Sequence, residues 1–410
     1  MSLAPLFDAG PGTAGEQVQS VLQAVRRHLA MDVGFVSEFV SGRRVFRFTD
    51  GQASGHPITV GASDPLDKSF CYYVARGMMP ELMHDAGEDP TALQLPVTHD
   101  LPVGAHLSVP LRHSDGTTYG SVCCFSFTPD RSLTTRDLGL LRLCADLVGT
   151  ILQRERCAAS EWEMRRARLN AVIEGGAIQI AYQPIYSLRD GRLKAFEALA
   201  RFPDEPMRGP EAWFAEAAQF GLDEALEFLA AERALAAFAW LDPGLKLTVN
   251  LSPARIVSPR FPELFADAPL DRIVLELTEH AGVESYDWLR QALAPLRAQG
   301  LRLAIDDVGA GHSTFRHVLE LSPEYIKLDM SLIRAIDRDT ARRALAESIT
   351  AYGRRTGCEV VAEGIETPAE FAALRDIGVT CAQGYLLGRP VAIEEAVRVP
   401  ETALFPDEAA

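Results

Sequence analysis

Apolar runs alternate with helical patterns throughout residues 177–400. Eight runs of five to ten residues have the largely continuous hydrophobicity of strands that are buried on both faces. Their ranges are 178–185, 193–202, 245–251, 273–278, 302–307, 325–329, 359–363 and 382–387. Helical periodicity lies between most of them, at 210–220, 224–240, 286–299, 314–321, 331–355 and 368–377. Strands that alternate with helices form parallel sheets, so this half predicts a TIM-like α/β barrel, with an open doubly wound sheet as the alternative.

Residues 1–150 have a different pattern, which predicts a small α+β domain. Apolar residues first recur at helical spacing, and two pairs of β-rich runs follow, each typical of a hairpin. The predicted elements are a helix at 15–30, strands at 33–40 and 43–48, a short helix at 69–76, and strands at 105–112 and 118–127. This order differs from the alternation of the second half, so the chain is expected to contain two or three domains.

A long helix is predicted to connect these parts over residues 135–175. Thr134 is a suitable N-cap, and Gly175-Gly176 would end the helix. Its apolar residues follow a coiled-coil spacing for two heptads, after which the seam becomes patchy and the helix is rich in charge. The pattern favours pairing with a second copy in a homodimer. The alternative is a helix that packs only on its own domain.

Charge and cysteine content restrict the classes of function. The formal net charge is -16, so duplex nucleic acid is not an expected partner. The longest apolar runs are too short to span a membrane, and the N-terminus lacks the pattern of a signal peptide. The seven cysteines form no CxxC pair, which argues against a zinc site or a disulfide framework. A cytoplasmic protein with reduced thiols is expected.

Polar side chains gather at one end of the predicted barrel strands. The set comprises Glu197, Asn250, Glu276, Glu279, Asp306, Asp307, Lys327, Glu363 and Gln383. The adjacent pair Asp306-Asp307, taken alone, could be a helix cap and a surface acid. The carboxyl ends of barrel strands converge on one mouth, however, so the whole set is expected to meet there.

Such a cluster of acids requires cations to remain ionised. Its ligands are all oxygen atoms, which favours Mg²⁺ or Mn²⁺ over zinc. Two cations bridged by one carboxylate suit attack by water on a phosphodiester. Lys327 could hold that water or the phosphate charge.

The second half resembles the EAL family of cyclic di-GMP phosphodiesterases over residues 165–400, with 401–410 as a tail. The matching motifs are Tyr182-Gln183-Pro184-Ile185, Glu197-Ala198-Leu199, Asn250-Leu251-Ser252, Glu276-Leu277-Thr278-Glu279, Asp306-Asp307, Lys327-Leu328-Asp329, Ala362-Glu363-Gly364-Ile365-Glu366 and Gln383-Gly384-Tyr385. Each motif is short, but the ordered set is specific. The resemblance implies metal-dependent hydrolysis of cyclic di-GMP to linear pGpG, and a homodimer.

The resemblance also implies a role for each residue of the set. Glu197, Asn250, Glu276 and Asp306 would bind one metal, and Asp306 would bridge to a second metal that Asp307 also binds. Lys327 would contact the attacking water, Glu363 would be the general base or a metal-site acid, and Gln383 would assist the water or a metal. Gln183, Leu199 and Arg201 resemble substrate contacts. Glu279 resembles the acid that stabilises the loop after the Asp pair.

That loop departs from the family pattern, since Val308, Ala310, His312 and Thr314 replace the usual Phe, Thr, Tyr and Ser. The departure bears on regulation and leaves the metal ligands in place. The alternative function is a non-catalytic receptor for cyclic di-GMP or a protein, but receptors of this type usually lack some of the metal acids.

The first domain resembles a GAF domain over roughly residues 15–155. The resemblance rests on Val103-Gly104-Ala105-His106-Leu107-Ser108-Val109-Pro110-Leu111 and Tyr119-Gly120-Ser121-Val122-Cys123-Cys124-Phe125. It implies a regulatory domain that senses a ligand or redox state, or one that serves only for dimer contacts. The motifs that would identify a cyclic nucleotide or a bilin as its ligand are absent, so the ligand is unknown.

Overall fold

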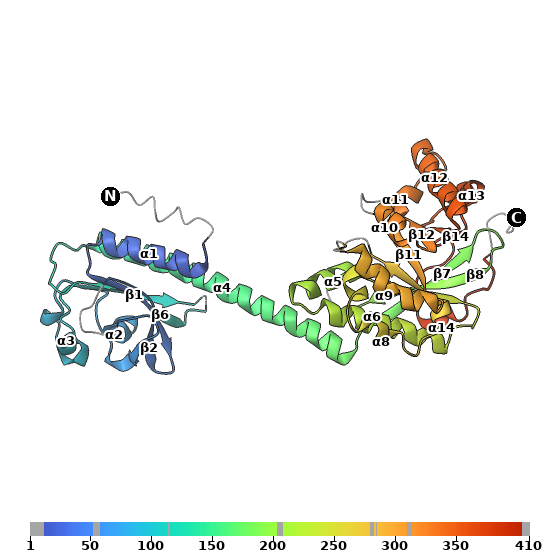
Figure 1. Cartoon of the computed structure of the whole chain (residues 1–410). Helices are drawn as coiled ribbons and strands as arrows, with labels where there is room; N and C mark the ends of the chain where they lie inside the picture. The colour runs from blue at the N-terminus through green and yellow to red at the C-terminus, as the bar shows by residue number, and fades with distance from the viewer. Residues whose placement is uncertain are drawn as a thin grey trace. The chain divides into compact units, whose positions relative to one another are not determined.

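The computed structural model describes residues 12–51, 58–113, 115–202, 208–278, 283, 285–309 and 314–403. The chain divides into two compact units, residues 1–164 and 165–410, which are described separately (Figure 1). The prediction of an α+β domain followed by a TIM-like barrel is confirmed.

The first unit is built on a six-stranded antiparallel sheet with the order β3-β2-β1-β6-β5-β4. The strands are β1 (Val33–Val40), β2 (Arg43–Gly51), β3 (Ser63–Pro65), β4 (Leu82–Met83), β5 (His106–Arg112) and β6 (Thr118–Phe125). The short edge strands β3 and β4 were not predicted, because two or three residues show no periodicity. Successive residues of the central strands face opposite sides, which gives the sheet two separate cores.

Different helices cover the two faces of this sheet. On one face, α1 (Ala14–His28) and the first part of α4 (Thr135–Gly175) pack around Val36, Leu107 and Cys124. On the other face, α2 (Phe70–Ala75) places Cys71 among Phe35, Phe46 and Cys123. The remaining helix is α3 (Pro96–Asp100), and short 3₁₀ turns occupy Leu66–Lys68, Ala86–Glu88 and Ala92–Gln94.

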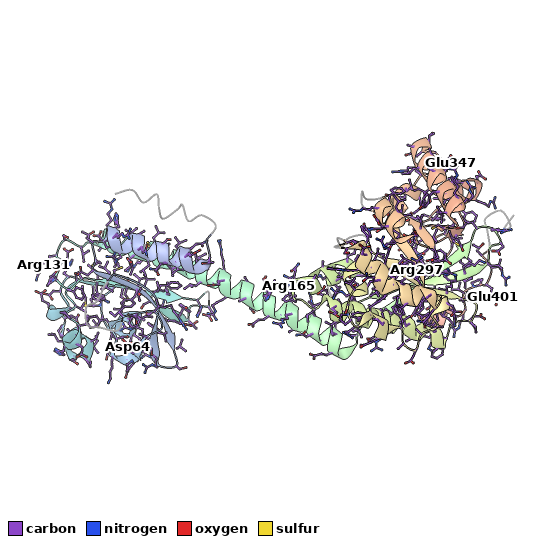
Figure 2. All side chains as sticks on the ribbon, in the orientation of Figure 1. Asp64, Arg131, Arg165, Arg297, Glu347 and Glu401 are labelled. Atoms are coloured by element: carbon purple, nitrogen blue, oxygen red, sulfur yellow. The ribbon has the colours of Figure 1, made fainter. Side chains whose placement is uncertain are left out.

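The connecting helix α4 is continuous for 41 residues, and Gly176 follows it with φ of +60°. Its last part belongs to the second unit, where Leu169 and Val172 pack against Trp213. Buried Glu216 accepts hydrogen bonds from Arg165 and from Arg168, both on α4, and from Arg208. Figure 2 labels Arg165 on this helix. None of the helices in the described ranges combines the length and the hydropathy of a membrane span.

The second unit is a closed eight-stranded barrel with the order β10-β11-β12-β13-β14-β7-β8-β9. The strands are β7 (Gln179–Ser187), β8 (Leu193–Arg201), β9 (Lys246–Leu251), β10 (Ile273–Leu277), β11 (Arg302–Val308), β12 (Tyr325–Leu328), β13 (Glu359–Ala362) and β14 (Cys381–Ala382). Strand β7 runs antiparallel to both neighbours. Its link to β8 is too short for the crossover that parallel strands require, so the two form a hairpin.

Helices enclose this barrel (Figure 1). They are α5 (Pro210–Gln219), α6 (Asp223–Leu235), α7 (Pro253–Ile256), α8 (Phe261–Leu264), α9 (Tyr286–Ala298), α10 (Thr314–Leu321), α11 (Met330–Ile333), α12 (Thr340–Thr356), α13 (Pro368–Ile377) and α14 (Ile393–Ala396), with 3₁₀ turns at Ala236–Ala239 and Leu270–Arg272. The single helix predicted at 331–355 is wrong. Ala335 has φ of +61° and Asp339 caps a new helix through Ala341 N and Arg342 N, so α11 and α12 are separate.

Candidate active site

A single ammonium group lies at the centre of the predicted acid cluster. Lys327 projects from β12 into the barrel and is 2% exposed. Its Nζ lies 3.1 Å from Glu197 Oε1, 3.0 Å from Glu276 Oε2, 3.1 Å from Asp306 Oδ1 and 2.6 Å from Glu363 Oε1. The structure therefore brings together acids from four different strands or strand ends, as the sequence predicted.

A bulge in β11 explains how two adjacent acids reach one region. Ile305 pairs with Ile326 of β12, and Val308 pairs with Leu328, so two residues of β11 stand opposite Lys327 alone. The first acid, Asp306, accepts a hydrogen bond at 3.0 Å from the backbone N–H of Asp307, whose φ is +51°. A bulge of this kind turns a side chain away from strict alternation. Carboxylate oxygens of Asp306, Asp307 and Glu363 consequently lie within 4.8 Å of one another.

Charge is unbalanced in this cluster, because one ammonium faces four carboxylates. The pKa values of Glu276 and Glu363 are raised well above their usual range. Burial is the largest cause and the neighbouring carboxylates add to it, although the charge of Lys327 acts in the opposite direction. Burial would also raise the pKa of Glu197, but the charge of Lys327 and the hydrogen bonds with Gln383, Lys327 and Glu276 together outweigh it, and the pKa falls. Burial lowers the pKa of Lys327, yet the carboxylates raise it well above its usual range. Without another cation, the cluster must therefore retain protons.

The donor set fits hard divalent cations. The buried oxygens Glu276 Oε1 and Gln383 Oε1 have no hydrogen-bond partner among the described residues. Asn250 is half-buried and lies in register with Glu276 on the adjacent strand. Carboxylate and amide oxygens are the ligands that Mg²⁺ and Mn²⁺ prefer, and cations would also replace the protons that the acids otherwise retain.

Two glutamines extend the cluster toward β7. Gln383 donates from Nε2 to Glu197 Oε2 and, at 2.9 Å, to Gln183 Oε1. Gln183 donates in turn to the backbone oxygen of Gly388 at 3.0 Å. Leu199 and Arg201 lie further along β8 and are half-buried, and Arg201 donates to Ala200 O at 2.8 Å. The hydrogen bonds of Gln383 and Gln183 fix the orientation of both glutamine side chains.

Comparison with known protein families agrees with this geometry. The EAL domain family matches residues 165–390, which is more than half of the chain. The chain belongs to the EAL family. The GAF domain family matches residues 14–152.

Two curated relatives and one solved structure illustrate the similarity. An uncharacterized signaling protein of Caulobacter vibrioides is 31% identical over 80% of this chain and 41% of its own length. The probable cyclic di-GMP phosphodiesterase PdeG of Escherichia coli is 30% identical over 60% of this chain and 50% of its own length. The structure of PaMucR phosphodiesterase in its c-di-GMP complex is 26% identical, with a TM-score of 0.52, over 57% of this chain and 99% of that chain. The chain thus spans half or less of both curated relatives.

Part of the predicted site of this EAL domain lies outside the described residues. Glu279, Ala310 and His312 belong to that part. Val308 is described, and it is fully buried at the end of β11. It packs in the main core of the barrel.

Glu370 on α13 positions the segment that follows Glu363, and the sequence reasoning missed it. Its carboxylate accepts hydrogen bonds from the backbone N–H groups of Ala335 at 3.0 Å, Glu366 at 3.2 Å and Thr367 at 3.1 Å. Thr367 and Glu370 also form a capping box. The Thr-x-x-Glu spacing could have revealed the cap, but the bond to Ala335 required the structure.

Glu370→Ala is expected to reduce the free energy of unfolding by about 1–3 kcal/mol, because three backbone N–H groups lose their hydrogen bonds to a charged, buried carboxylate. Burial would raise the pKa of Glu370, but these backbone hydrogen bonds outweigh it and lower the pKa. The carboxylate therefore stabilises the fold above its unfolded pKa of about 4.3, and this contribution is lost as the pH falls through the folded pKa. Urea unfolding at a series of pH values should show the deficit in full at neutral pH and a smaller deficit below about pH 4.

Glu347→Ala is the matched control for this measurement. Glu347 is exposed on α12 (Figure 2), and among the described residues its ion pair is with Arg343 at 3.1 Å. The control should change the free energy of unfolding by less than about 0.5 kcal/mol. An equal effect of the two substitutions would contradict the positioning role of Glu370.

Proposed function

We propose that this protein is a metal-dependent phosphodiesterase that hydrolyses cyclic di-GMP to linear pGpG. The observation that carries the proposal is the cluster of four carboxylates around Lys327, with two buried oxygens left for a cation. The identity of the substrate is proposed from the names of two similar proteins, PdeG and the PaMucR complex.

The metal-holding residues are proposed in two groups. Glu197, Asn250, Glu276 and Asp306 would hold one divalent cation, and Asp306 and Asp307 would hold a second. Mg²⁺ or Mn²⁺ bound there supplies positive charge that polarises the phosphodiester and acidifies the attacking water. The described oxygen donors fit this assignment in type and burial.

The other residues of the cluster have proposed roles in the hydrolytic step. Water attacks one phosphorus, the bond from phosphorus to the 3′-oxygen breaks, and linear pGpG results. Lys327 orients the water, and Glu363 accepts its proton. Gln383 assists the water or a metal, and its amide nitrogen holds Glu197 and Gln183 in place. Leu199, Arg201 and Gln183 contact the substrate. The ion pair of 2.6 Å between Lys327 and Glu363 keeps the proposed base beside the proposed water site.

Regulation by the GAF domain is the second element of the proposal. Helix α4 begins within the span matched to the GAF family and ends within the span matched to the EAL family, so one continuous helix belongs to both. A change that a GAF ligand causes in the first half of this helix would act on its second half. We propose that the protein acts as a homodimer in the cytoplasm, with α4 as part of the dimer contact.

A hydrolysis assay on the full chain tests the catalytic proposal. Incubation with cyclic di-GMP and either Mg²⁺ or Mn²⁺ should yield linear pGpG, separable by anion-exchange chromatography, and a chelator should stop the reaction. Glu363→Gln should lose turnover, whereas the control Glu359→Gln, at the exposed start of the strand that ends just before Glu363, should not. Tight binding of cyclic di-GMP without hydrolysis in either metal, across pH 7 to 9, would instead support a receptor.

A further inference from the structure

Two cysteines meet in the core of the GAF unit, on the face of the sheet that α2 covers. Cys71 comes from α2 and Cys123 from the central strand β6, 52 residues later in the chain. Both side chains are fully buried, and their sulfur atoms lie 3.2 Å apart. The adjacent Cys124 faces the other side of the sheet, in the core below α1 and α4. The pair is therefore a specific contact between two elements.

A buried guanidinium stands beside one of the two sulfur atoms. Arg44 of β2 is 6% exposed, and its Nη1 lies 3.2 Å from Cys71 Sγ. Its other nitrogens bind Asp64, with Nε at 3.0 Å from Oδ1 (Figure 2). Phe35 and Phe46 flank the guanidinium, with their ring centroids 5.4 Å and 4.9 Å from its carbon. A cation held this way stabilises a thiolate.

The two thiols differ in acidity because of these surroundings. Burial would raise the pKa of Cys71, but the hydrogen bond with Cys123 and the charge of Arg44 lower it to about 6. Burial and the contact with Cys71 raise the pKa of Cys123 well above its usual range. Cys123 also lies 3.0 Å from Ser108 Oγ and 3.3 Å from Ser121 Oγ. The surroundings thus favour the thiolate at Cys71 and the protonated thiol at Cys123.

A metal site is the obvious alternative use of this cluster. His106 is buried near Phe70, with ring centroids 5.2 Å apart, and no hydrogen-bond partner of its Nδ1 is described. Burial and the charge of Arg44 lower the pKa of His106 to about 3, so the ring is neutral. A metal ion would have to lie beside the buried Arg44 cation, whose charge opposes it. The arrangement favours chemistry between the two sulfur atoms.

We propose that Cys71 and Cys123 form a reversible dithiol–disulfide site whose oxidant is hydrogen peroxide or another small hydroperoxide. The Cys71 thiolate attacks one oxygen of hydrogen peroxide, the O–O bond breaks, and Cys71 sulfenic acid and a hydroxide ion form. The hydroxide ion takes a proton from solvent and becomes water. The Cys123 sulfur then attacks the Cys71 sulfur, the S–O bond breaks, and the disulfide and a second water form. Two electrons pass from the thiols to one peroxide. The sulfur atoms need to approach by about 1.2 Å to reach the bonded distance.

The disulfide would change the GAF core in two ways. It would join α2 covalently to the centre of the sheet, and it would remove the thiolate that Arg44 neutralises. Arg44 would then have Asp64 as its remaining anionic contact among the groups described around it. Because both sulfur atoms are buried, only an oxidant about the size of a water molecule can reach them, and it enters when α2 opens locally. A small peroxide meets this requirement, whereas a bulky disulfide reagent does not.

Thiol counting on the full chain tests the proposal. The reduced protein is treated with hydrogen peroxide, denatured and alkylated, and its peptides are mapped. Of the seven cysteines, Cys71 and Cys123 should escape alkylation and appear as one linked peptide pair, and dithiothreitol should restore both. Cys124→Ser, a change on the opposite face of the same strand, should leave this result unchanged.

Two further variants separate the steps. Cys123→Ser should stop at Cys71 sulfenic acid, which dimedone traps, and Cys71→Ser should leave Cys123 alkylatable after the same treatment. Retention of both thiols at a peroxide dose that oxidises the exposed Cys157 would overturn the proposal. A linkage that maps to other cysteines, such as Cys124 and Cys144, would also overturn it.

Discussion

Glu197→Gln is expected to lower kcat/KM for hydrolysis of cyclic di-GMP by more than about 100-fold, since loss of a group that only supports a metal ligand already costs about 10- to 100-fold. The substitution keeps the size of the side chain but removes one charge from a 6% exposed position. Glu197 contacts both Lys327 and Gln383, so its charge acts at the centre of the cluster. Steady-state kinetics in Mg²⁺ and calorimetric titration with Mn²⁺ measure turnover and metal affinity separately.

Both quantities should fall together if Glu197 is a metal ligand. Glu211→Gln is the matched control, because it makes the same chemical change at an exposed position in the first turn of α5. The control should retain full turnover and metal affinity. Full activity of Glu197→Gln would contradict the ligand assignment. A loss of turnover with unchanged metal affinity would assign Glu197 to substrate binding or orientation instead.

The sequence predicted the barrel because most of its strands have enough apolar residues to be recognised independently of their neighbours. The strand predicted at 382–387 is wrong in its bounds, since β14 comprises only Cys381–Ala382. The sequence also predicted the acids at the strand ends, since convergence of strand ends is a general property of barrels. The antiparallel β7 follows from the short link between Ser187 and Leu193, and the sequence contained that information. The break between α11 and α12 was missed, although Asp339 is a recognisable N-cap.

Contacts between distant elements were beyond the sequence reasoning. The bulge that places Asp306 and Asp307 opposite Lys327 depends on the register between β11 and β12, which periodicity alone does not determine. The contact between Cys71 and Cys123 joins elements 52 residues apart, so only the packing of α2 on the sheet shows it. Local pattern predicts which residues are buried, but the three-dimensional packing decides which of them touch.

The second large effect is expected from Lys327→Met. Removing one partner of a buried ionic group costs about 3–5 kcal/mol, because the remaining charges stay buried and uncompensated. Here the four carboxylates that lie within 3.1 Å of Nζ would lose the one ammonium that contacts them all. Urea unfolding in the presence of a chelator should show this loss at pH 7.

The carboxylates of the variant can reduce their repulsion only by taking up protons or by binding cations. The deficit of Lys327→Met should therefore shrink as the pH is lowered, and Mg²⁺ or Mn²⁺ should stabilise the variant more than the wild type. Lys246→Met is the matched control, since Lys246 Nζ contacts the neutral Tyr325 hydroxyl at 2.8 Å. Its stability should respond to metal as the wild type does. If Mg²⁺ or Mn²⁺ stabilised neither Lys327→Met nor the wild type, these acids would bind no cation, which would remove the physical basis for a metal-dependent phosphodiesterase.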